Sequence, residues 1–365
     1  MIEIIHCITT IRLGGAEKQL LTLVEQQIKS GYKVTVIYLK DTPELKLNFE
    51  RLGAEVLDFL SDKFFFTQVF LFKKYLRNKT SILHAHLPRA ELFCAITKQK
   101  NQLIISKHNS ERFFPKSNFL FSKLLARYTF SKSTACICIS FAVRNYLIDI
   151  GEIYEGNKLN VVHYGYSENI INKLRTSDSS KNELGVSEFF VFGTIARLTK
   201  QKNYKILLIS FAKICDDHDN VKLIIVGDGP DKRRIIDSAK KLKIFEKIIW
   251  VTHTDDVYRY LSAMDVFILA SNYEGFGLVL LEAMQSGIPI IAPNNSSIPE
   301  VMGSSYPGLF VTNNSLELVS QLTLTFDREY RNNLIKIYNH RLSMFTPNFM
   351  HEKISLIYQK SLNRN

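Results

Sequence analysis

Apolar runs and polar turns alternate most clearly in residues 265–300. The run 266–270 predicts a buried strand, and the polar turn 271–277 follows it. Apolar residues 278–285 then predict a helix, and the run 288–292 predicts a second buried strand. This is a strand–turn–helix–strand unit whose turn lies at the carboxyl end of a strand, where open α/β sheets bind ligands.

The same alternation extends along the chain. Further strands are predicted at residues 2–10, 33–39, 54–60, 81–86, 103–106, 136–140, 189–196, 222–226 and 248–251. Helical segments separate most of them, which indicates parallel sheets. The polar segment 166–187 is the best candidate for a linker between two domains. A helical tail, about 315–362, ends in an amphipathic stretch from 349 to 362.

Length and composition fit a soluble two-domain protein. The 365 residues exceed one typical core and suit two domains of about 170 residues each. No apolar run reaches the roughly 18 residues of a membrane span, and the first ten residues read as a strand and not a signal peptide. Five cysteines, an odd number mostly in apolar runs, suggest reduced thiols in a cytoplasm, and the Cys136–Cys138 spacing does not favour zinc.

The net charge of +12 is uneven. Residues 1–180 contain 25 basic and 16 acidic side chains (+9), whereas residues 181–365 contain 22 and 19 (+3). This excess in the first half implies an anionic partner. Aromatic and basic residues interleave at 63–77 and 112–132, a pattern that suits a membrane interface, nucleic acid or ordinary helix packing.

The turn at 271–277 and the helix after it combine two glutamates with two glycines. Glu274 and Glu282 are eight residues apart, and carboxylates accept hydrogen bonds from sugar hydroxyls. Gly275 and Gly277 allow close approach of the backbone, and the exposed amides at a helix start suit a phosphate. The alternative is a solvated turn glutamate and a helix glutamate in a salt bridge.

Two other turns offer anion-binding groups. Arg197 and Lys202 flank a predicted strand-to-helix turn, where a guanidinium and an ammonium can bind one phosphate. Gly14-Gly15 follows the first predicted strand and either approaches a phosphate or simply makes a tight turn. It does not match the dinucleotide fingerprint GxGxxG, which weakens a nicotinamide interpretation.

These motifs together resemble the family 4 retaining glycosyltransferases of the GT-B fold. The segment from Glu274 to Glu282 resembles their E-x7-E motif, residues 14–17 their GGAE motif, and residues 197–202 their pyrophosphate-binding R-L-x-x-x-K pattern. His108-Asn109 is similar to a family position that reaches the donor sugar. The loop 227–230 is similar to one near the donor's nucleoside.

The resemblance implies two Rossmann-like domains that face each other across a cleft, with a C-terminal helix that crosses back to the first. We expect an acceptor-side domain at 1–170, a nucleotide-sugar domain at 185–345 and the crossing helix at 346–365. The expected donor-binding residues are Gly14, Gly15, Arg197, Lys202, Gly229, Glu274, Gly275, Phe276, Gly277, Leu278 and Glu282. The expected catalytic residues are Glu274, His108, Arg197 and Lys202, and His86 is expected on the acceptor side.

The expected activity is transfer of a sugar, with retention, from a nucleotide-diphosphate sugar to a glycan or lipid-linked glycan in cell-surface polysaccharide synthesis. No cofactor or metal is expected, because no DxD pair lies in a suitable loop and Asp255-Asp256 more plausibly begins a helix. We expect a cytoplasmic protein, peripheral at the anionic inner membrane face, that binds no nucleic acid. A sugar-nucleotide epimerase and a non-catalytic nucleic-acid-binding protein are the alternatives.

The chain departs from the family pattern at two places. Thr252-His253-Thr254 and Ser296-Ser297 stand where family members usually have glycine. Both departures concern the expected base and sugar pockets, so the resemblance does not identify the sugar or the nucleotide.

Overall fold

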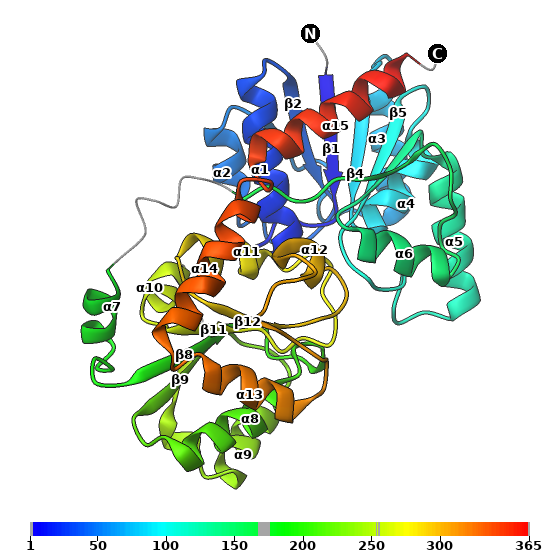
Figure 1. Ribbon diagram of the computed structural model, residues 1–365. Helices are drawn as coiled ribbons and strands as arrows, with labels where there is room; N and C mark the ends of the chain where they lie inside the picture. The colour runs from blue at the N-terminus through cyan, green and yellow to red at the C-terminus, as the bar shows by residue number, and fades with distance from the viewer. Residues whose placement is uncertain (1–2, 167–175, 253, 255, 364–365) are drawn as a thin grey trace. The chain divides into compact units, whose positions relative to one another are not determined.

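The computed structural model describes residues 3–166, 176–252, 254 and 256–363. The chain forms two structural units (Figure 1). Residues 1–167 and 345–365 make the first unit, and residues 168–344 make the second.

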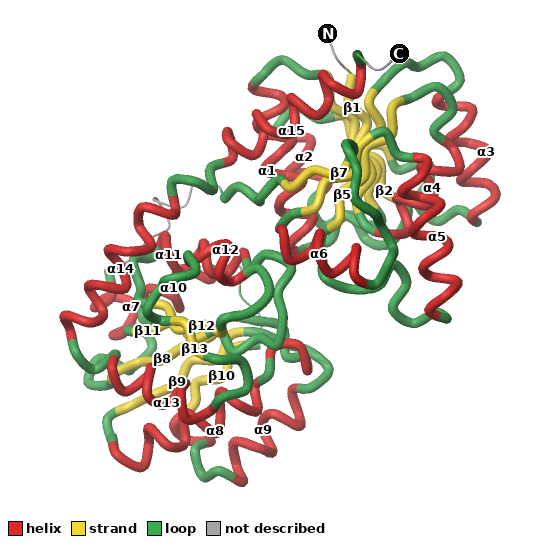
Figure 2. The backbone as a smooth tube through the Cα atoms, turned by 45° about the vertical axis from the view of Figure 1, so that its right-hand side comes forward, coloured by secondary structure: helices red, strands yellow, loops and turns green. Residues whose placement is uncertain are grey.

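Within its described residues, the first unit contains a seven-stranded parallel sheet in the order β3-β2-β1-β4-β5-β6-β7. The strands are β1 (Glu3–Ile8), β2 (Lys33–Tyr38), β3 (Glu55–Leu57), β4 (Ile82–His86), β5 (Gln102–Lys107), β6 (Ala135–Cys138) and β7 (Leu159–Val161). The helices are α1 (Gly15–Lys29), α2 (Lys46–Arg51), α3 (Phe65–Leu76), α4 (Pro88–Thr97), α5 (Phe119–Lys132), α6 (Phe141–Asp149) and α15 (Pro347–Leu362). Helices cover both faces of the sheet, which explains the continuous apolar runs of its central strands (Figure 2).

The last helix, α15, packs against α1 in the first unit. Its buried Tyr358 lies within hydrogen-bonding distance of Gln27 in α1 and of His84 in β4. Two backbone segments pass close to each other where this helix begins. A Cβ atom at Gly165 would lie 2.7 Å from the Cα of Pro347. The expected return of the C-terminal helix to the first domain is confirmed.

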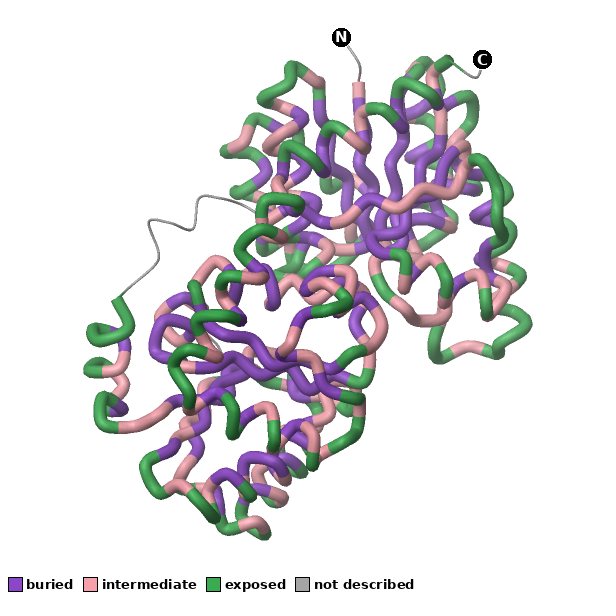
Figure 3. The backbone as a smooth tube through the Cα atoms, in the orientation of Figure 1, coloured by how far each residue is buried: buried purple, intermediate pink, exposed green. Residues whose placement is uncertain are grey.

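The second unit contains, in its described part, a six-stranded parallel sheet in the order β10-β9-β8-β11-β12-β13. The strands are β8 (Phe190–Ile195), β9 (Val221–Val226), β10 (Ile248–Val251), β11 (Val266–Ile268), β12 (Ile290–Pro293) and β13 (Leu309–Phe310). The α-helices are α7 (Ser177–Glu183), α8 (Tyr204–Asp217), α9 (Lys232–Lys241), α10 (Val257–Ser262), α11 (Leu278–Gln285), α12 (Ile298–Met302), α13 (Ser315–Leu324) and α14 (Arg328–Leu342), with short 3-10 turns at Lys200–Lys202 and Phe245–Lys247. Burial is concentrated in the strands of both sheets (Figure 3). Two Rossmann-like parallel-sheet domains are confirmed.

Several predicted elements differ from the observed ones. The strand expected at 54–60 is only Glu55–Leu57 at the edge of the sheet, and the one expected at 288–292 begins at Ile290. The supposed linker 166–187 contains α7, whose first turn is capped by the Thr176 hydroxyl accepting from the Ser179 amide. Residues 167–175, His253 and Asp255 lie outside the described residues, so the departure at 252–254 is described only in part.

All five cysteines are free thiols, and four of them are buried. This agrees with their interpretation as reduced core residues. Among the described residues, no helix has the length and apolar character needed to cross a bilayer.

Candidate functional site

An ion pair joins two of the predicted site residues in the second unit. Lys202 Nζ lies 2.5 Å from Glu274 Oε1, and Ser271 Oγ donates a hydrogen bond of 2.6 Å to the same oxygen. Glu274 is only 6% exposed. Because β8 and β11 are neighbours in the sheet, the loops that follow them are adjacent, which brings Lys202 and Glu274 together from 72 residues apart.

The backbone of Glu274 is held by two serines that occupy the expected glycine positions. Ser296 Oγ and Ser297 Oγ donate to the Glu274 carbonyl oxygen at 2.6 and 3.1 Å, and the Glu274 amide donates to Ser296 Oγ at 3.2 Å. Ser296 has a φ of 53°, a left-handed conformation in which glycine is favoured. The backbone thus keeps a glycine-like conformation, while the hydroxyls fix the carboxylate's loop.

Helix α11 begins directly after this loop. Gly277 is its N-cap at a φ of 88°, and the preceding Phe276 is buried. Gly275 and Leu278, the other predicted donor-binding residues here, are partly exposed at the same helix start, where amides suit a phosphate.

Glu282 lies in α11 and is half-buried. Burial chiefly raises the pKa of Tyr258 in α10, and the nearby charge of Glu282 raises it further. The Glu282 charge therefore acts on the Tyr258 phenol, a neighbour that the sequence alone did not indicate.

Arg197 is exposed in the loop after β8, and this loop is joined to the one after β9. The Leu198 amide donates to the Asp228 carbonyl at 2.9 Å, and the Asp231 amide donates to the Leu198 carbonyl at 3.0 Å. A Cβ atom at Gly229 would lie 2.4 Å from the Leu198 carbonyl oxygen. Gly229 therefore has a structural reason to be glycine, in addition to the predicted role at the donor.

We expect Gly229→Ala to lower the free energy of unfolding by about 1–3 kcal/mol, because the new methyl group meets backbone and not a flexible side chain. Urea unfolding measures this change. Gly156→Ala is the matched control, since no atom lies within 4 Å of its added Cβ and its φ is not positive. An effect of the same size in both variants would contradict the proposed clash.

In the first unit, Gly14 and Gly15 begin α1 as predicted for a strand–turn–helix. A Cβ atom at Gly14 would lie 2.3 Å from Glu17 Oε2, and Thr10 Oγ1 donates to Glu17 Oε1 at 3.0 Å. Glu17 is buried in the first turn of the helix. Glycine at 14 therefore leaves room for this carboxylate, which the sequence interpretation did not select.

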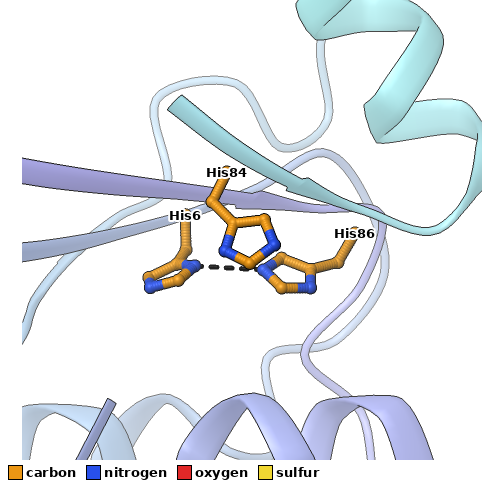
Figure 4. Close-up of side chains that lie close together, drawn as sticks. All are labelled: His6, His84 and His86. Carbon is orange, nitrogen blue, oxygen red and sulfur yellow. Dashed lines mark hydrogen bonds between the residues drawn. The ribbon is translucent and has the colours of Figure 1, made fainter. Parts of the chain in front are cut away.

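The two predicted histidines lie in a larger, mostly buried cluster in β1 and β4 and just after β5. Figure 4 shows His6, His84 and His86 with their rings close together. His86 Nδ1 lies 3.1 Å from His108 Nε2, and His108 Nδ1 is hydrogen-bonded to the Tyr164 hydroxyl. Both ring nitrogens of His86 and of His108 therefore have protein partners. Sequence reasoning missed His6 and His84, because their strands read only as apolar runs.

Burial keeps these histidines neutral. Desolvation lowers the pKa of His6 to about 4 and that of His108 to about 3, with the Lys107 charge as a further cause for His108. Desolvation also places the pKa of His84 and of His86 well below the ordinary value.

Among the described residues, one group of three or more potential metal ligands was found: His6, His84 and His86, whose nearest ligand atoms lie within 4.8 Å of one another. All six of their ring nitrogens have hydrogen-bond partners within the protein, and no carboxylate belongs to the group. A bound cation would have to break this network.

The structure thus places the predicted residues at the carboxyl ends of parallel strands in both units. In the second unit, Lys202 and Glu274 are in contact, while Arg197, Gly229 and Glu282 lie in or just after the loops of β8, β9 and β11. In the first unit, His86 and His108 are in contact, and Gly14 and Gly15 follow β1. The role of each residue in binding or catalysis remains a prediction.

Comparison with known proteins adds independent information. The chain is 29% identical over 232 residues to N-acetyl-alpha-D-glucosaminyl L-malate synthase of Bacillus anthracis. The aligned region covers 62% of this chain and 60% of that protein. It is 24% identical over 315 residues to a Campylobacter jejuni N-acetylgalactosaminyltransferase that acts on a diphospho-undecaprenol glycan, with 82% of both chains covered. The chain spans only 45–60% of the length of the first three curated relatives that it matches.

Solved structures share the fold. Anabaena HepE in complex with UDP-glucose superposes with a TM-score of 0.83 at 20% identity, over 99% of this chain and 100% of that one. WaaG, a glycosyltransferase involved in lipopolysaccharide biosynthesis, superposes with a TM-score of 0.72 at 14% identity, over 96% and 98% of the two chains.

Two family models match adjacent parts of the chain. Residues 13–169 match the model described as Glycosyltransferase Family 4, and residues 176–339 match the one described as Glycosyl transferases group 1. Together they cover most of both structural units. The chain is a member of glycosyltransferase family 4, with the GT-B fold.

Proposed function

We propose that the protein transfers a sugar from a nucleotide-diphosphate sugar to a glycan or lipid-linked glycan acceptor, in the synthesis of a cell-surface polysaccharide. The Lys202–Glu274 pair, next to the start of α11, is the observation that carries this proposal. It places an ammonium, a carboxylate and helix amides at one end of the sheet. A relative that acts on a diphospho-undecaprenol glycan, a glycosyltransferase of O-antigen biosynthesis, and a structural neighbour solved in complex with UDP-glucose support the same class of reaction.

The proposed roles follow from charge and reach. Arg197 and Lys202 stabilise the negative charge that builds on the departing diphosphate. Glu282 binds the ribose, and Glu274 binds the donor sugar together with amides of residues 275–278. The remaining Lys202 N–H groups are available for phosphate oxygens, since an ammonium has three donors and one contacts Glu274.

Transfer with retention and without a metal cofactor completes the proposal. The two cationic side chains and the α11 amides supply the positive potential that a divalent ion would otherwise provide. We assign no covalent nucleophile. His108 is proposed to contribute on the donor-sugar side and His86 on the acceptor side, through the network that holds both rings.

A thermal-shift panel of uridine- and guanosine-diphosphate sugars tests the donor class. One donor is expected to raise the melting temperature, because a ligand at a hundred times its dissociation constant stabilises the folded state by about 2.7 kcal/mol. Incubation of that donor with an acceptor glycan should then release the nucleoside diphosphate. A new sugar nucleotide formed from the donor alone would contradict the transferase proposal, as would the absence of a shift with every donor.

We also propose that the first unit docks on the anionic inner face of a membrane. Helices α3 and α5 both pack against α4 and carry exposed aromatic and aliphatic side chains. Phe64 and Phe66 are 88% and 85% exposed at the start of α3. On and beside these helices, the other large exposed apolar residues are Phe65, Phe70, Phe119, Leu120, Phe121, Leu124 and Tyr128.

The charge of this surface agrees with an anionic partner. The basic residues of the two segments include Lys73, Lys74, Arg77, Lys116, Lys123 and Lys132, and residues 112–132 contain no acidic residue. Ordinary packing accounts for the buried Phe72 and Phe130 but not for the exposed phenylalanines. Apolar side chains with nearby lysines are typical of interfacial membrane binding.

We expect the protein to float with vesicles that contain phosphatidylglycerol and to float less with phosphatidylcholine alone. The double variant Phe66→Ser/Phe70→Ser should reduce the bound fraction at least tenfold, because each phenylalanine that enters the interface contributes about 1.5–3 kcal/mol. Leu316→Ser, at an exposed leucine of α13, is the matched control. Equal flotation with both lipids, or an equal loss in both variants, would exclude docking through α3 and α5.

A further inference from the structure

A continuous chain of hydrogen bonds runs from Gln27 in α1 through three histidines to a tyrosine. His6 Nε2 lies 2.8 Å from Gln27 Oε1, and His6 Nδ1 lies 3.0 Å from His86 Nε2. His86 Nδ1 lies 3.1 Å from His108 Nε2, and His108 Nδ1 is bonded to the Tyr164 hydroxyl. We call this series of contacts the long branch.

A second series begins at the other end of the same amide. Gln27 Nε2 donates to the Tyr358 hydroxyl oxygen at 3.2 Å, and that hydroxyl lies 2.7 Å from His84 Nδ1. His84 Nε2 lies 2.8 Å from Ser106 Oγ. We call this the short branch. Gln27 is fully buried and is the junction of the two branches.

The direction of each hydrogen bond is coupled to the next. A neutral imidazole has one N–H and one lone pair, so a ring that accepts at one nitrogen must donate at the other. Because Gln27 Oε1 can only accept, His6 must donate from Nε2 and accept at Nδ1. His86 then donates to His6 from Nε2, and His108 donates to His86 from Nε2.

The same reasoning applies at both ends. His108 is left with a lone pair on Nδ1, to which the Tyr164 hydroxyl donates. In the short branch the Tyr358 hydroxyl accepts from Gln27, donates to His84 Nδ1, and leaves His84 to donate from Nε2 to Ser106. Two histidines of opposite tautomer would place two N–H groups or two lone pairs against each other.

We propose that Gln27 sets the direction of hydrogen bonding in both branches, so that His6, His84, His86 and His108 all have the neutral Nε2–H tautomer. Gln27 and His6 are thus positioning residues that act on His108 through His86. The consequence for sugar transfer rests on the proposed function, whereas the tautomers themselves do not. The low pKa of each ring, caused mainly by burial, supports the neutral state.

Nuclear magnetic resonance of the 15N-histidine-labelled protein at pH 7 tests the proposal directly. Long-range proton–nitrogen spectra distinguish the two neutral tautomers, the imidazolium and a metal-bound ring. Four Nε2–H patterns, assigned with single histidine variants, are expected for the cluster. An Nδ1–H tautomer, an imidazolium or a metal-bound ring at any of the four positions would overturn the proposal.

The variant Gln27→Met tests the role of the junction, because methionine keeps the length of the side chain but has neither the amide oxygen nor the amide protons. The His86 and His108 signals should become averages of both tautomers, and kcat should fall about fivefold, which corresponds to about 1 kcal/mol. Gln26→Met, at the neighbouring and partly exposed glutamine of α1, is the matched control and should keep the wild-type spectrum.

Unchanged His86 and His108 tautomers in Gln27→Met would show that Gln27 does not set the direction, and would overturn the proposal even if kcat fell. The Nε2–H patterns in a wild-type protein that binds no sugar nucleotide would instead support the tautomer assignment and contradict only the proposed function.

Discussion

Replacement of Lys202 by alanine is expected to lower kcat for sugar transfer by about a thousandfold, the loss typical of removing a preorganised group that stabilises transition-state charge. Lys202 Nζ is held 2.5 Å from a buried carboxylate, so its side chain loses little further conformational entropy when it stabilises the departing diphosphate. Initial rates of nucleoside diphosphate release measure the effect. Circular dichroism checks that the variant is folded.

Lys205→Ala is the control, because Lys205 is an exposed lysine in the same segment, at the start of α8. Its kcat should match that of the wild type. A Lys202→Ala enzyme with a rate near wild type would remove Lys202 from the proposed catalytic role.

A double-mutant cycle examines whether Lys202 and Glu274 work together. Glu274→Gln keeps the shape of the side chain but removes its charge, and we expect a loss of similar size. If the two residues form one functional pair, Lys202→Ala/Glu274→Gln should be scarcely slower than either single variant. Multiplication of the two losses would instead show that Lys202 acts on the diphosphate and Glu274 on the sugar without depending on their ion pair.

The second large effect concerns acid stability. His6, His84, His86 and His108 have a lower pKa in the folded protein than the ordinary value of 6.5, because burial disfavours the charged ring. As the pH falls below 6.5, the unfolded chain binds protons that the folded chain does not. The contribution of these neutral histidines to the free energy of unfolding is therefore fully present above about pH 6.5 and is lost as the pH falls toward 4.

Each such histidine adds a slope of about 1.4 kcal/mol per pH unit within this window. We expect the free energy of urea unfolding of the wild type to decrease steeply between pH 6.5 and 4.5. His6→Gln should give a shallower slope, although this variant is less stable than the wild type at pH 7. Identical slopes in the two proteins would show that the buried cluster does not take part in acid unfolding.

Other groups in the same unit also titrate or carry charge near the cluster. The Lys107 charge lowers the pKa of His108, and Lys107 forms a buried ion pair with Glu91 at 2.5 Å; burial raises the pKa of Glu91. A carboxyl with a raised pKa becomes protonated at higher pH than in the unfolded chain, so Glu91 opposes the loss caused by the histidines. The His6→Gln comparison isolates the histidine contribution, because Glu91 is present in both proteins.

The sequence predicted the fold well, because parallel strands covered by helices leave continuous apolar runs. Residues 278–285 are predicted as a helix and form one, α11. Edge strands were less predictable. β3 has only three residues and pairs with a single neighbour at the edge of the sheet. Because it is partly exposed, its residues need not be apolar, and its ends are harder to predict from sequence.

The site was predicted in its residues more than in its contacts. Glu274 and Lys202 were selected from motifs, but their direct pairing depends on the adjacency of β8 and β11, which sequence spacing does not specify. In the sequence Ser296 is only a departure from glycine, whereas in the structure its hydroxyl holds the Glu274 backbone. The sequence did not predict a role for His6 and His84, because the partners of a polar residue in a buried strand depend on how the strands pair.

The position of Tyr358 has a consequence for how the protein is made. This side chain completes the buried hydrogen bonding of Gln27 and His84, yet it is synthesised only after the entire second unit. On the ribosome, Gln27 and His84 therefore lack the Tyr358 hydroxyl, and the first unit lacks the cover of α15, while residues 168–344 emerge. Nascent chains stalled before α15 should hold an N-terminal half that proteases cleave readily and that chaperones bind.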